Sequence, residues 1–321
     1  MYTNVALLDV ASMHPTSIEQ LNLFGDYTPN FSALKAARLA IKHKDYDAAG
    51  VMLGGKLKPF LVDKDGADAL AYALKIVINI VYGLTSAKFD NPFRDTRNKD
   101  NIVAKRGALF MIDLKEAVQA QGFTVAHIKT DSIKIPDATP EIIQFVMDFG
   151  AKYGYDFEHE ATYEKFCLVN DAVYVAKSDK GWTAVGAQYQ HPYVFKTLFS
   201  KEDITFDDLC ETKQVVQGAM YIDFDAVQKP MALSDSHMHF IGKSGRFVPV
   251  TADSGGGVLY RVKDDKLFAV TGTKNYLWME ASQAKAMGDE VEIDMGYFED
   301  LLTDANRTLR KYGDSEAFLR S

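Results

Sequence analysis

Two short apolar runs, residues 123–128 and 132–135, lie on either side of the polar triplet Lys129-Thr130-Asp131. β-forming runs joined by a few polar residues are typical of a hairpin, whose strands pair antiparallel. A third apolar run, residues 4–10, predicts a buried strand that ends at Asp9. The sequence therefore predicts an antiparallel sheet with an aspartate at two of its strand junctions.

Amphipathic patterns predict helices at residues 17–24, 31–43, 67–82, 101–121 and 140–153. Gly83 is a good C-terminal signal for the third of these helices. Further strands are predicted at residues 166–169 and 172–176, and β-rich runs dominate after about residue 181 until a final helix at residues 297–312. The fold class predicted from this mixture is α/β, of the α+β type.

The charge of the chain is unevenly distributed. The formal net charge is −8, but residues 30–115 hold 15 Lys and Arg against 9 Asp and Glu, so this segment carries +6 and the remainder −14. A basic segment in an acidic chain is expected where a surface faces phosphates. A solvated helical face explains the charge equally well.

Cysteine content and hydropathy limit the cellular setting. Cys167 and Cys210 are too few for a disulfide framework or a zinc site, and no secretory signal is visible at the N-terminus, so we expect a cytoplasmic protein. The most apolar segment, residues 67–81, carries Asp68 and Lys75 and is predicted to be too short to cross a membrane, so no membrane contact is expected.

Three segments carry residues suited to chemistry. The first is DVASMHP at residues 9–15, the second is KIVINIVYG at residues 75–83, and the third is HIKTDS at residues 127–132. Lys75, Asn79 and Tyr82 stand at helical spacing, so one helix face offers a cation, an amide and a ring. Each segment alone has a structural explanation: a turn aspartate, a snorkelling lysine, or a residue that shapes a hairpin.

Together the three segments resemble, in order, the signatures of family B DNA polymerases: DxxSLYPS, KxxxNSxYG and DTDS. They read DVASMHPT, KIVINIVYG and KTDS in this chain. The intervening NIVAKRGALFMIDL resembles the palm helix of that family, and HEATY and NDAVY resemble its palm-to-thumb strands, most closely those of protein-primed phage polymerases. The resemblance covers about residues 1–180.

This resemblance implies a right-hand polymerase architecture. The palm, with its antiparallel sheet, would be residues 1–24 and 84–180, the helical fingers residues 25–83, and the thumb with accessory β structure residues 181–321. The implied activity is DNA-directed DNA polymerisation by two-metal nucleotidyl transfer, using Mg²⁺ or Mn²⁺, with primer-template DNA and deoxynucleoside triphosphates as partners. A phage source would place the protein in the host cell cytoplasm.

The resemblance also implies residue roles. Asp9 and Asp131 would be catalytic and would hold the metal ions together with Val10. The nucleotide would be bound by Ser12, Met13, His14, Arg38, Lys42, Lys75, Asn79 and Tyr82. The DNA would be contacted by Gly83, Thr130, Ser132 and Tyr174.

The chain departs from the family pattern at several positions. Lys129 stands where the family has its first hairpin acid, His14 where it has the tyrosine that excludes ribonucleotides, and Ala172 where it has a primer-contacting lysine. We expect His14 to keep this discrimination by the bulk of its ring. Since family members carry an exonuclease ahead of the first signature, we expect a separate exonuclease or N-terminal polymerase subunit.

Two other functions stay open from the sequence. One is a catalytically weak or silent polymerase-like module that binds DNA within a replication complex, which Lys129 and Ala172 favour. The other is an untemplated nucleotidyltransferase or primase. The retained Asp9, Lys75 and Asp131 favour the polymerase.

Overall fold

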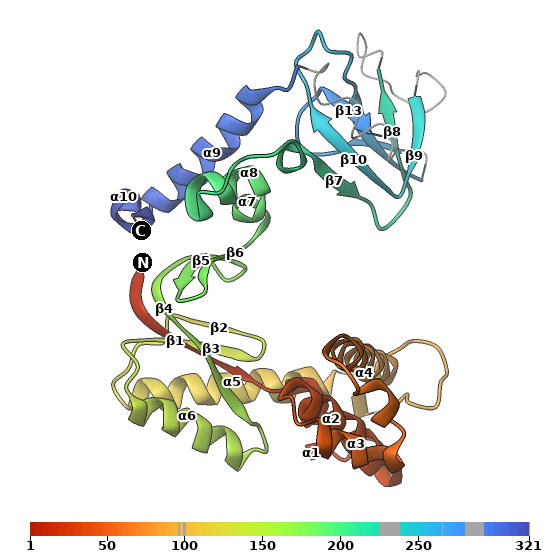
Figure 1. Cartoon of the computed structure of the whole chain (residues 1–321), viewed down its shortest axis with the longest axis vertical. Coiled ribbons are helices and arrows are strands. Elements are labelled where there is room, and N and C mark those ends of the chain that lie inside the picture. Colours follow the sequence, from red (N-terminus) through yellow and green to blue (C-terminus); the bar gives the residue numbers. More distant parts are fainter. Residues whose placement is uncertain (96, 99–100, 225–237, 265, 280–291, 321) are drawn as a thin grey trace. The chain divides into compact units, whose positions relative to one another are not determined.

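The computed structural model describes residues 1–95, 97–98, 101–224, 238–264, 266–279 and 292–320. The chain divides into two compact units, Tyr2–Glu164 and Lys165–Ser321, the second of which includes Met1. We call these the N-terminal and C-terminal units (Figure 1). The three-part division into palm, fingers and thumb stays a prediction.

An antiparallel sheet forms the centre of the N-terminal unit. Its strands are β1 (Tyr2–Val10), β2 (His127–Lys129), β3 (Ser132–Pro136) and the first part of β4 (Phe157–Asn170), in the order β2-β3-β1-β4. The register pairs Asp9 with Ser132 and Lys129 with Ser132, so β2 and β3 are joined by a two-residue loop. The predicted strand at residues 4–10 and the predicted hairpin are confirmed.

The first hairpin strand is shorter than predicted. Residues 123–126 form no strand, although they are apolar. Phe123 and Val125 instead pack against the hydrophobic core, so their apolar character reflects burial and not strand pairing. A short apolar run has the same pattern in either case.

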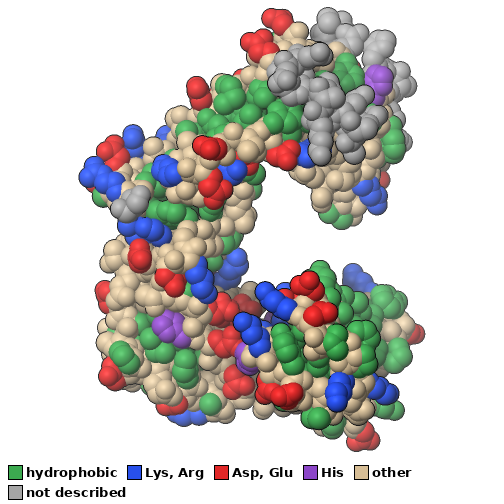
Figure 2. All heavy atoms as spheres, in the orientation of Figure 1, with side chains coloured by type: hydrophobic (Ala, Val, Ile, Leu, Met, Phe, Trp, Pro, Cys, Tyr) green, Lys and Arg blue, Asp and Glu red, His purple; other side chains and the backbone are tan. Residues whose placement is uncertain are grey.

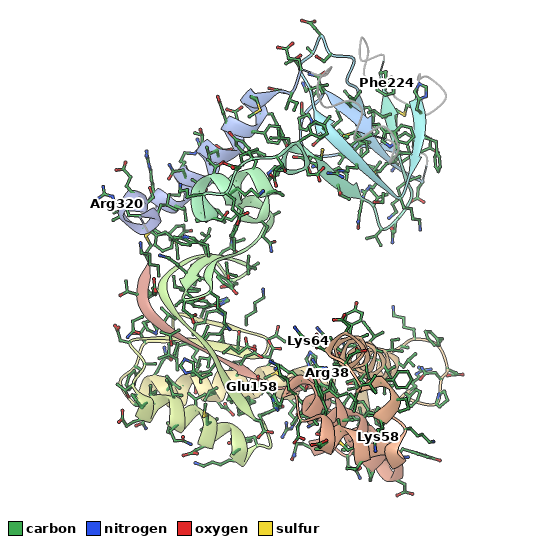
Figure 3. The ribbon with its side chains drawn as sticks, viewed as in Figure 1. Arg38, Lys58, Lys64, Glu158, Phe224 and Arg320 are labelled. Carbon is green, nitrogen blue, oxygen red and sulfur yellow. The ribbon has the colours of Figure 1, made fainter. Side chains whose placement is uncertain are left out.

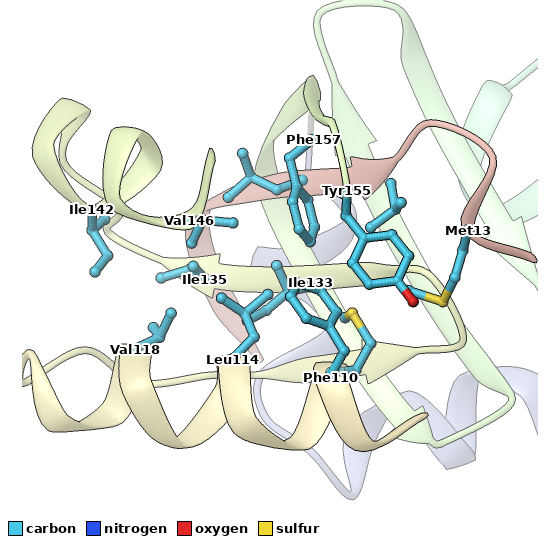
Figure 4. Close-up of a cluster of buried hydrophobic side chains, with 13 residues drawn as sticks. Met13, Phe110, Leu114, Val118, Ile133, Ile135, Ile142, Val146, Tyr155 and Phe157 are labelled. Carbon is cyan, nitrogen blue, oxygen red and sulfur yellow. The ribbon is translucent and has the colours of Figure 1, made fainter. Parts of the chain in front are cut away.

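Two helices cover one face of this sheet, α5 (Ile102–Ala120) and α6 (Pro140–Lys152). Strand alternation directs Leu8 and Ile133 into the core between sheet and helices (Figure 4). The same alternation directs Asp9, Ser132 and Lys134 to the opposite face of the sheet. The helix-covered face therefore holds the sheet in place, and the other face is left for a site.

The rest of the N-terminal unit is helical. It comprises α1 (Met13–Gln20), η1 (Gly25–Tyr27), α2 (Thr28–Lys42), α3 (Tyr46–Val51), η2 (Met52–Gly55), η3 (Lys58–Phe60) and α4 (Lys64–Thr85). Helices α2 and α4 pack together through a core that includes Ala37, Ile41 and Leu74. The Asp63 side chain caps α4 by accepting a hydrogen bond from the Gly66 N–H at 2.7 Å.

Helix α4 is longer than its sequence pattern indicated. It continues past Gly83 to Thr85, so the predicted end at Gly83 is wrong. A glycine within a helix costs only about 1 kcal/mol relative to alanine, which the packing of this helix offsets. Thr85 lies at the true end, where its hydroxyl accepts a hydrogen bond from the Asn98 amide at 2.5 Å.

The prediction that this segment is too short to cross a membrane is also wrong. Among the described residues, α4 is the one helix long and apolar enough to do so, with 22 residues and a mean hydropathy of 1.5 over an 18-residue window. Length and composition alone do not separate such a helix from one in a soluble protein. Tyr72, Ile76 and Ile80 are exposed on it, and hydrophobic side chains gather there in Figure 2.

The C-terminal unit continues the sheet from the end of β4 into β5 (Val173–Ser178) and β6 (Gly181–Val185). Short helical segments follow: α7 (Ala187–Gln190), α8 (Pro192–Phe195), η5 (Lys196–Ser200) and η6 (Phe206–Leu209). Two more sheets are built from β7 (Glu211–Gln214), β8 (Ala219–Asp223), β9 (Met238–Gly242), β10 (Ser244–Pro249), β11 (Val258–Lys263), β12 (Lys266–Ala269) and β13 (Tyr276–Met279).

The chain closes with α9 (Met295–Arg310) and α10 (Ser315–Leu319). The predicted β-rich region after residue 181 and the predicted final helix are thus present. With helices and antiparallel sheets mixed in both units, the α+β class is confirmed.

Candidate active site

The two predicted catalytic carboxylates lie on neighbouring elements of the N-terminal unit. Asp9 is the last but one residue of β1, and Asp131 lies in the turn that joins β2 to β3. The Val10 N–H donates to the Asp131 carbonyl at 2.8 Å, which fixes the two backbones side by side. Thr130, before Asp131, has a φ of 35°, which is unusual for a β-branched residue and marks a tightly shaped turn.

The turn after Asp9 presents the N-terminus of α1 to the same place. Ser12 adopts the left-handed conformation with a φ of 69°, and α1 begins at Met13. Within the described residues no side chain caps this helix, so its first N–H groups are available to an anion. The N–H groups of Val10 and Ala11 are already used, by Asp131 and by Asp156, so donation to a ligand begins at Ser12.

Helix α2 contributes two cations. The Arg38 guanidinium donates to Ser12 Oγ at 3.1 Å, and burial lowers its pKa while Glu158 opposes that shift. Lys42 donates to Glu158 Oε2 at 2.8 Å, and His43 lies 3.0 Å from the other oxygen of Glu158. Figure 3 labels Arg38 and Glu158 on α2 and β4. Lys42 must therefore release the Glu158 carboxylate before it can bind a phosphate.

These groups surround one cavity of ≈ 420 Å³, a size usual for small-molecule sites. Helix α4 adds Lys75 and Asn79 to its wall, and β4 adds Glu160. The residues predicted for metal or nucleotide that line it are Asp9, Val10, Ser12, Met13, His14, Arg38, Lys42, Lys75, Asn79 and Asp131. The structure thus brings together segments more than a hundred residues apart, while the roles of these residues stay predictions.

Three acidic side chains, those of Asp9, Asp131 and Glu160, line this cavity. The pKa of Asp9 is raised to about 7, mainly by burial and also by the charges of Asp131 and Glu160, while Lys42 and Lys134 act in the opposite direction. A divalent ion removes this unfavourable clustering of like charge. Oxygen ligands of this kind suit Mg²⁺.

The donor set would suit an ion that is shared with a substrate. In the described part of the chain no group of three or more His, Cys, Asp or Glu side chains is arranged to hold a metal. Mg²⁺ usually takes one or two carboxylates and completes its shell with water and substrate phosphates. Asp9 and Asp131, which line the cavity together with Val10, fit that pattern.

His14 and Tyr82 form one wall of the site. Their rings are stacked, with centroids 4.6 Å apart and planes inclined by 16°. Burial lowers the pKa of His14 against a weaker opposite effect of Asp131, so the ring is neutral near pH 7. Tyr82 does not line the cavity itself but supports the ring that does.

Met13 can serve a ligand only through its backbone. Its side chain is 3% exposed and packs into the core with Phe110. A Cβ on Gly107 of α5 would lie 2.7 Å from the Met13 sulfur, so the glycine allows α1 and α5 to approach closely.

The predicted DNA contacts are spread more widely. Thr130 lines a second cavity of ≈ 440 Å³, beside Met13 and His14. Gly83 is exposed on α4, and Ser132 is buried, with its hydroxyl 3.4 Å from the Lys129 carbonyl. Tyr174 belongs to the C-terminal unit, where its ring packs against Phe166.

Sequence reasoning missed two residues. Glu160 lies on the same face of β4 as Glu158, opposite to the buried Phe157, and lines the cavity. Lys134 is 1% exposed and shares a sheet face with Asp9. The alternation of Ser132-Ile133-Lys134-Ile135 was the available signal, since it directs the lysine away from the core.

Comparison with known proteins gives a match at the level of fold. No family model and no curated protein matches the sequence. Among solved structures, the chain is similar to the family B DNA polymerase from the hyperthermophilic archaeon Pyrobaculum calidifontis, with a TM-score of 0.51 and 13% identity. The match covers 96% of this chain and 45% of that chain, so this chain spans less than half the length of the polymerase. The fold is therefore family B DNA polymerase-like.

Proposed function

We propose that this chain is the catalytic core of a DNA-directed DNA polymerase. The observation that carries the proposal is the placement of Asp9, near the end of β1, and Asp131, in the bonded β2–β3 turn, in one cavity with the uncapped N-terminus of α1 and the cations of α2 and α4. Carboxylates opposite phosphate-binding groups are the arrangement that nucleotidyl transfer requires. The family B DNA polymerase-like fold supports the same function.

The proposed division of labour follows the geometry of the cavity. Asp9, Asp131 and the Val10 carbonyl would hold Mg²⁺, or Mn²⁺ in its place, with Glu160 nearby. Bound in pairs, such ions activate the primer hydroxyl and stabilise the leaving pyrophosphate. The N–H groups from Ser12 onward would bind the triphosphate, since a helix N-terminus favours anions.

Side chains on the helices would complete the nucleotide site. Lys75 and Arg38 would add charge to the triphosphate, and Lys42 would join them after leaving Glu158. Asn79 and the His14–Tyr82 ring pair would border the sugar and base. Gly83, Thr130, Ser132 and Tyr174 are proposed to contact the DNA.

Primer extension tests the proposal. Wild-type protein with Mg²⁺, deoxynucleotides and a defined primer-template should extend the primer according to the template. Asp131→Asn should reduce the rate by at least about 10³-fold, because it removes a charged metal ligand from an electrostatically stabilised reaction. Wild-type protein that gives no extension even with Mn²⁺ would contradict the proposal.

One observation favours a second function, a catalytically silent DNA-binding module. Lys129 occupies the hairpin position beside Asp131, and it places a positive charge where the resembling family has an acid. Tight binding of primer-template by a protein that does not extend it would support this alternative. We further propose a phage source, the host cell cytoplasm as the location, and a separate exonuclease or N-terminal polymerase subunit as a partner.

A further inference from the structure

A buried lysine lies under the acidic cluster of the site. Lys134 is 1% exposed, which is rare for a lysine without charged neighbours. It pairs with Leu7 across the sheet, two residues before Asp9 on the same strand face. Its ammonium donates to Ser132 Oγ at 3.3 Å.

The charged groups around Lys134 come from every element that borders it. Its pKa is lowered to about 8, mainly by burial and also by Lys129, whereas Asp9, Asp131 and Glu160 each act to raise it. The effect is mutual, because Lys134 and Lys42 lower the pKa of Asp9. Lys134, on the same sheet face as Asp9, therefore interacts with a cluster of three acidic side chains, those of Asp9, Asp131 and Glu160.

The buried lysine changes how strongly the acidic cluster attracts cations from solution. Three carboxylates without a cation would repel one another, and the repulsion is strong where water is partly excluded. A fixed ammonium offsets one of the three charges permanently. It also repels any divalent ion that approaches the same carboxylates.

We propose that Lys134 acts as a built-in cation of the acidic cluster, so that the nucleotide-free protein binds divalent ions weakly. The inference rests on the proposed function, since it concerns the same carboxylates. It assigns Lys134 a positioning role: the lysine sets the charge of the cluster and makes no contact with the substrate.

Mn²⁺ binding to the full chain tests this role without nucleotide or DNA. The amount of free Mn²⁺ is measured by electron paramagnetic resonance at pH 7 for wild type, Lys134→Met and Lys134→Arg. Lys134→Met removes the charge and keeps much of the volume, so we expect its Mn²⁺ affinity to be at least tenfold higher than that of wild type. Lys134→Arg keeps the charge and should keep weak binding.

Thermal unfolding gives a second readout. In EDTA, Lys134→Met should melt at a lower temperature than wild type, and Mn²⁺ should restore much of the difference. If Lys134→Met does not fold without metal, the double variant Lys134→Met with Asp9→Asn, which removes one charge of each sign, should fold. The exposed Lys152 on α6 provides the control, because Lys152→Met should change neither readout.

Two results would overturn the inference: two Mn²⁺ ions bound tightly by nucleotide-free wild type, or equal affinities for wild type and Lys134→Met. Failure of the underlying function has a different signature. Mn²⁺ binding by Lys134→Met that is unchanged by adding Asp131→Asn would mean that the ion does not occupy the proposed site at all.

Discussion

The ring pair of His14 and Tyr82 shows how single side chains shape this cavity. The neutral His14 ring lies flat on Tyr82 and lines the cavity, while Tyr82 stands behind it. A wall made in this way is rigid, since each ring restricts the rotation of the other. Such a wall can exclude a sugar with an additional hydroxyl by contact alone.

Replacing His14 therefore tests discrimination between nucleotides. His14→Ala should raise the efficiency of ribonucleotide incorporation, relative to deoxynucleotides, by at least about tenfold, the size expected for about 1.4 kcal/mol of lost steric exclusion. Steady-state incorporation of one nucleotide of each type measures the ratio. Tyr82→Phe keeps the stacked ring, so its ratio of ribonucleotide to deoxynucleotide incorporation should stay near that of wild type. If this ratio is unchanged in His14→Ala, the proposed role of ring bulk is contradicted.

Asp9 makes a pH-dependent contribution to stability. Its pKa is raised from the model-compound value of 3.8 to about 7, mainly by burial, so folding favours the protonated acid. Stability of the ion-free protein should then fall as pH rises from about 4 to 7 through this group, and stay low above that range. Asp9→Asn removes the charge, so it should raise the melting temperature in EDTA more at pH 8 than at pH 5. An equal rise at both values would argue against the shifted pKa.

Helix α4 illustrates why an element can differ from its sequence pattern. Its periodicity predicted the helix correctly, but Gly83 did not end it, because the helix has further contacts near Thr85. Gly83 adopts ordinary helical backbone, and a Cβ there would meet nothing within 4 Å. The glycine is therefore not required by the fold of this unit.

Two glycine-to-alanine substitutions, at Gly83 of α4 and Gly107 of α5, should have opposite effects on stability. Gly83→Ala should stabilise the protein by about 1 kcal/mol, from helix propensity alone, and should weaken primer-template binding if DNA approaches α4 there. Gly107→Ala should destabilise it by about 1–3 kcal/mol, because the added methyl collides with Met13. Denaturant unfolding measures both values, and a destabilised Gly83→Ala would show that this position is more constrained than its surroundings indicate.

The C-terminal unit contains a buried polar cluster that joins three of its elements, β7, β13 and α9, to the residue before α8. Glu211 of β7 accepts hydrogen bonds from Tyr276 of β13 at 2.6 Å and Tyr297 of α9 at 2.8 Å. It also pairs with Lys213, and with His191 immediately before α8. Burial alone would raise the pKa of Glu211, but the hydrogen bonds of His191, Lys213 and Tyr276 outweigh it and lower the pKa to about 2.

Acid should therefore weaken this unit through Glu211. The stabilisation is complete above the ordinary glutamate pKa of 4.5 and is lost as pH falls from 4.5 towards 2. Glu211→Gln should cost about 3 kcal/mol near pH 7, as expected for a broken buried pair, and its deficit relative to wild type should shrink below pH 4. Urea unfolding at pH 7 and pH 3.5 compares the two proteins; a deficit that does not depend on pH would contradict the assigned charge.

For the molecule as a whole, local patterns predicted more than long-range pairing. The strands 4–10 and 132–135, most of the helices and the α+β class follow from periodicity, which is a property of neighbouring residues. The helix predicted at residues 17–24 was displaced, since α1 spans Met13–Gln20 and residues 21–24 form turns. Glu160 and Lys134 were missed because their place beside Asp9 depends on which strands pair. The pairing of Lys42 with Glu158 was missed for the same reason, since the two lie 116 residues apart in the chain.

Templated incorporation of a single nucleotide shows whether this chain is a DNA-directed DNA polymerase. Four primer-templates that differ in one templating base are mixed in turn with each deoxynucleotide and Mg²⁺, under single-turnover conditions. The account predicts that wild type adds the complementary nucleotide in each case, that Asp9→Asn and Asp131→Asn are at least about 10³-fold slower, and that the exposed-surface control Asp26→Asn is unaffected. Addition that ignores the template, or that survives in Asp9→Asn and Asp131→Asn, would contradict it.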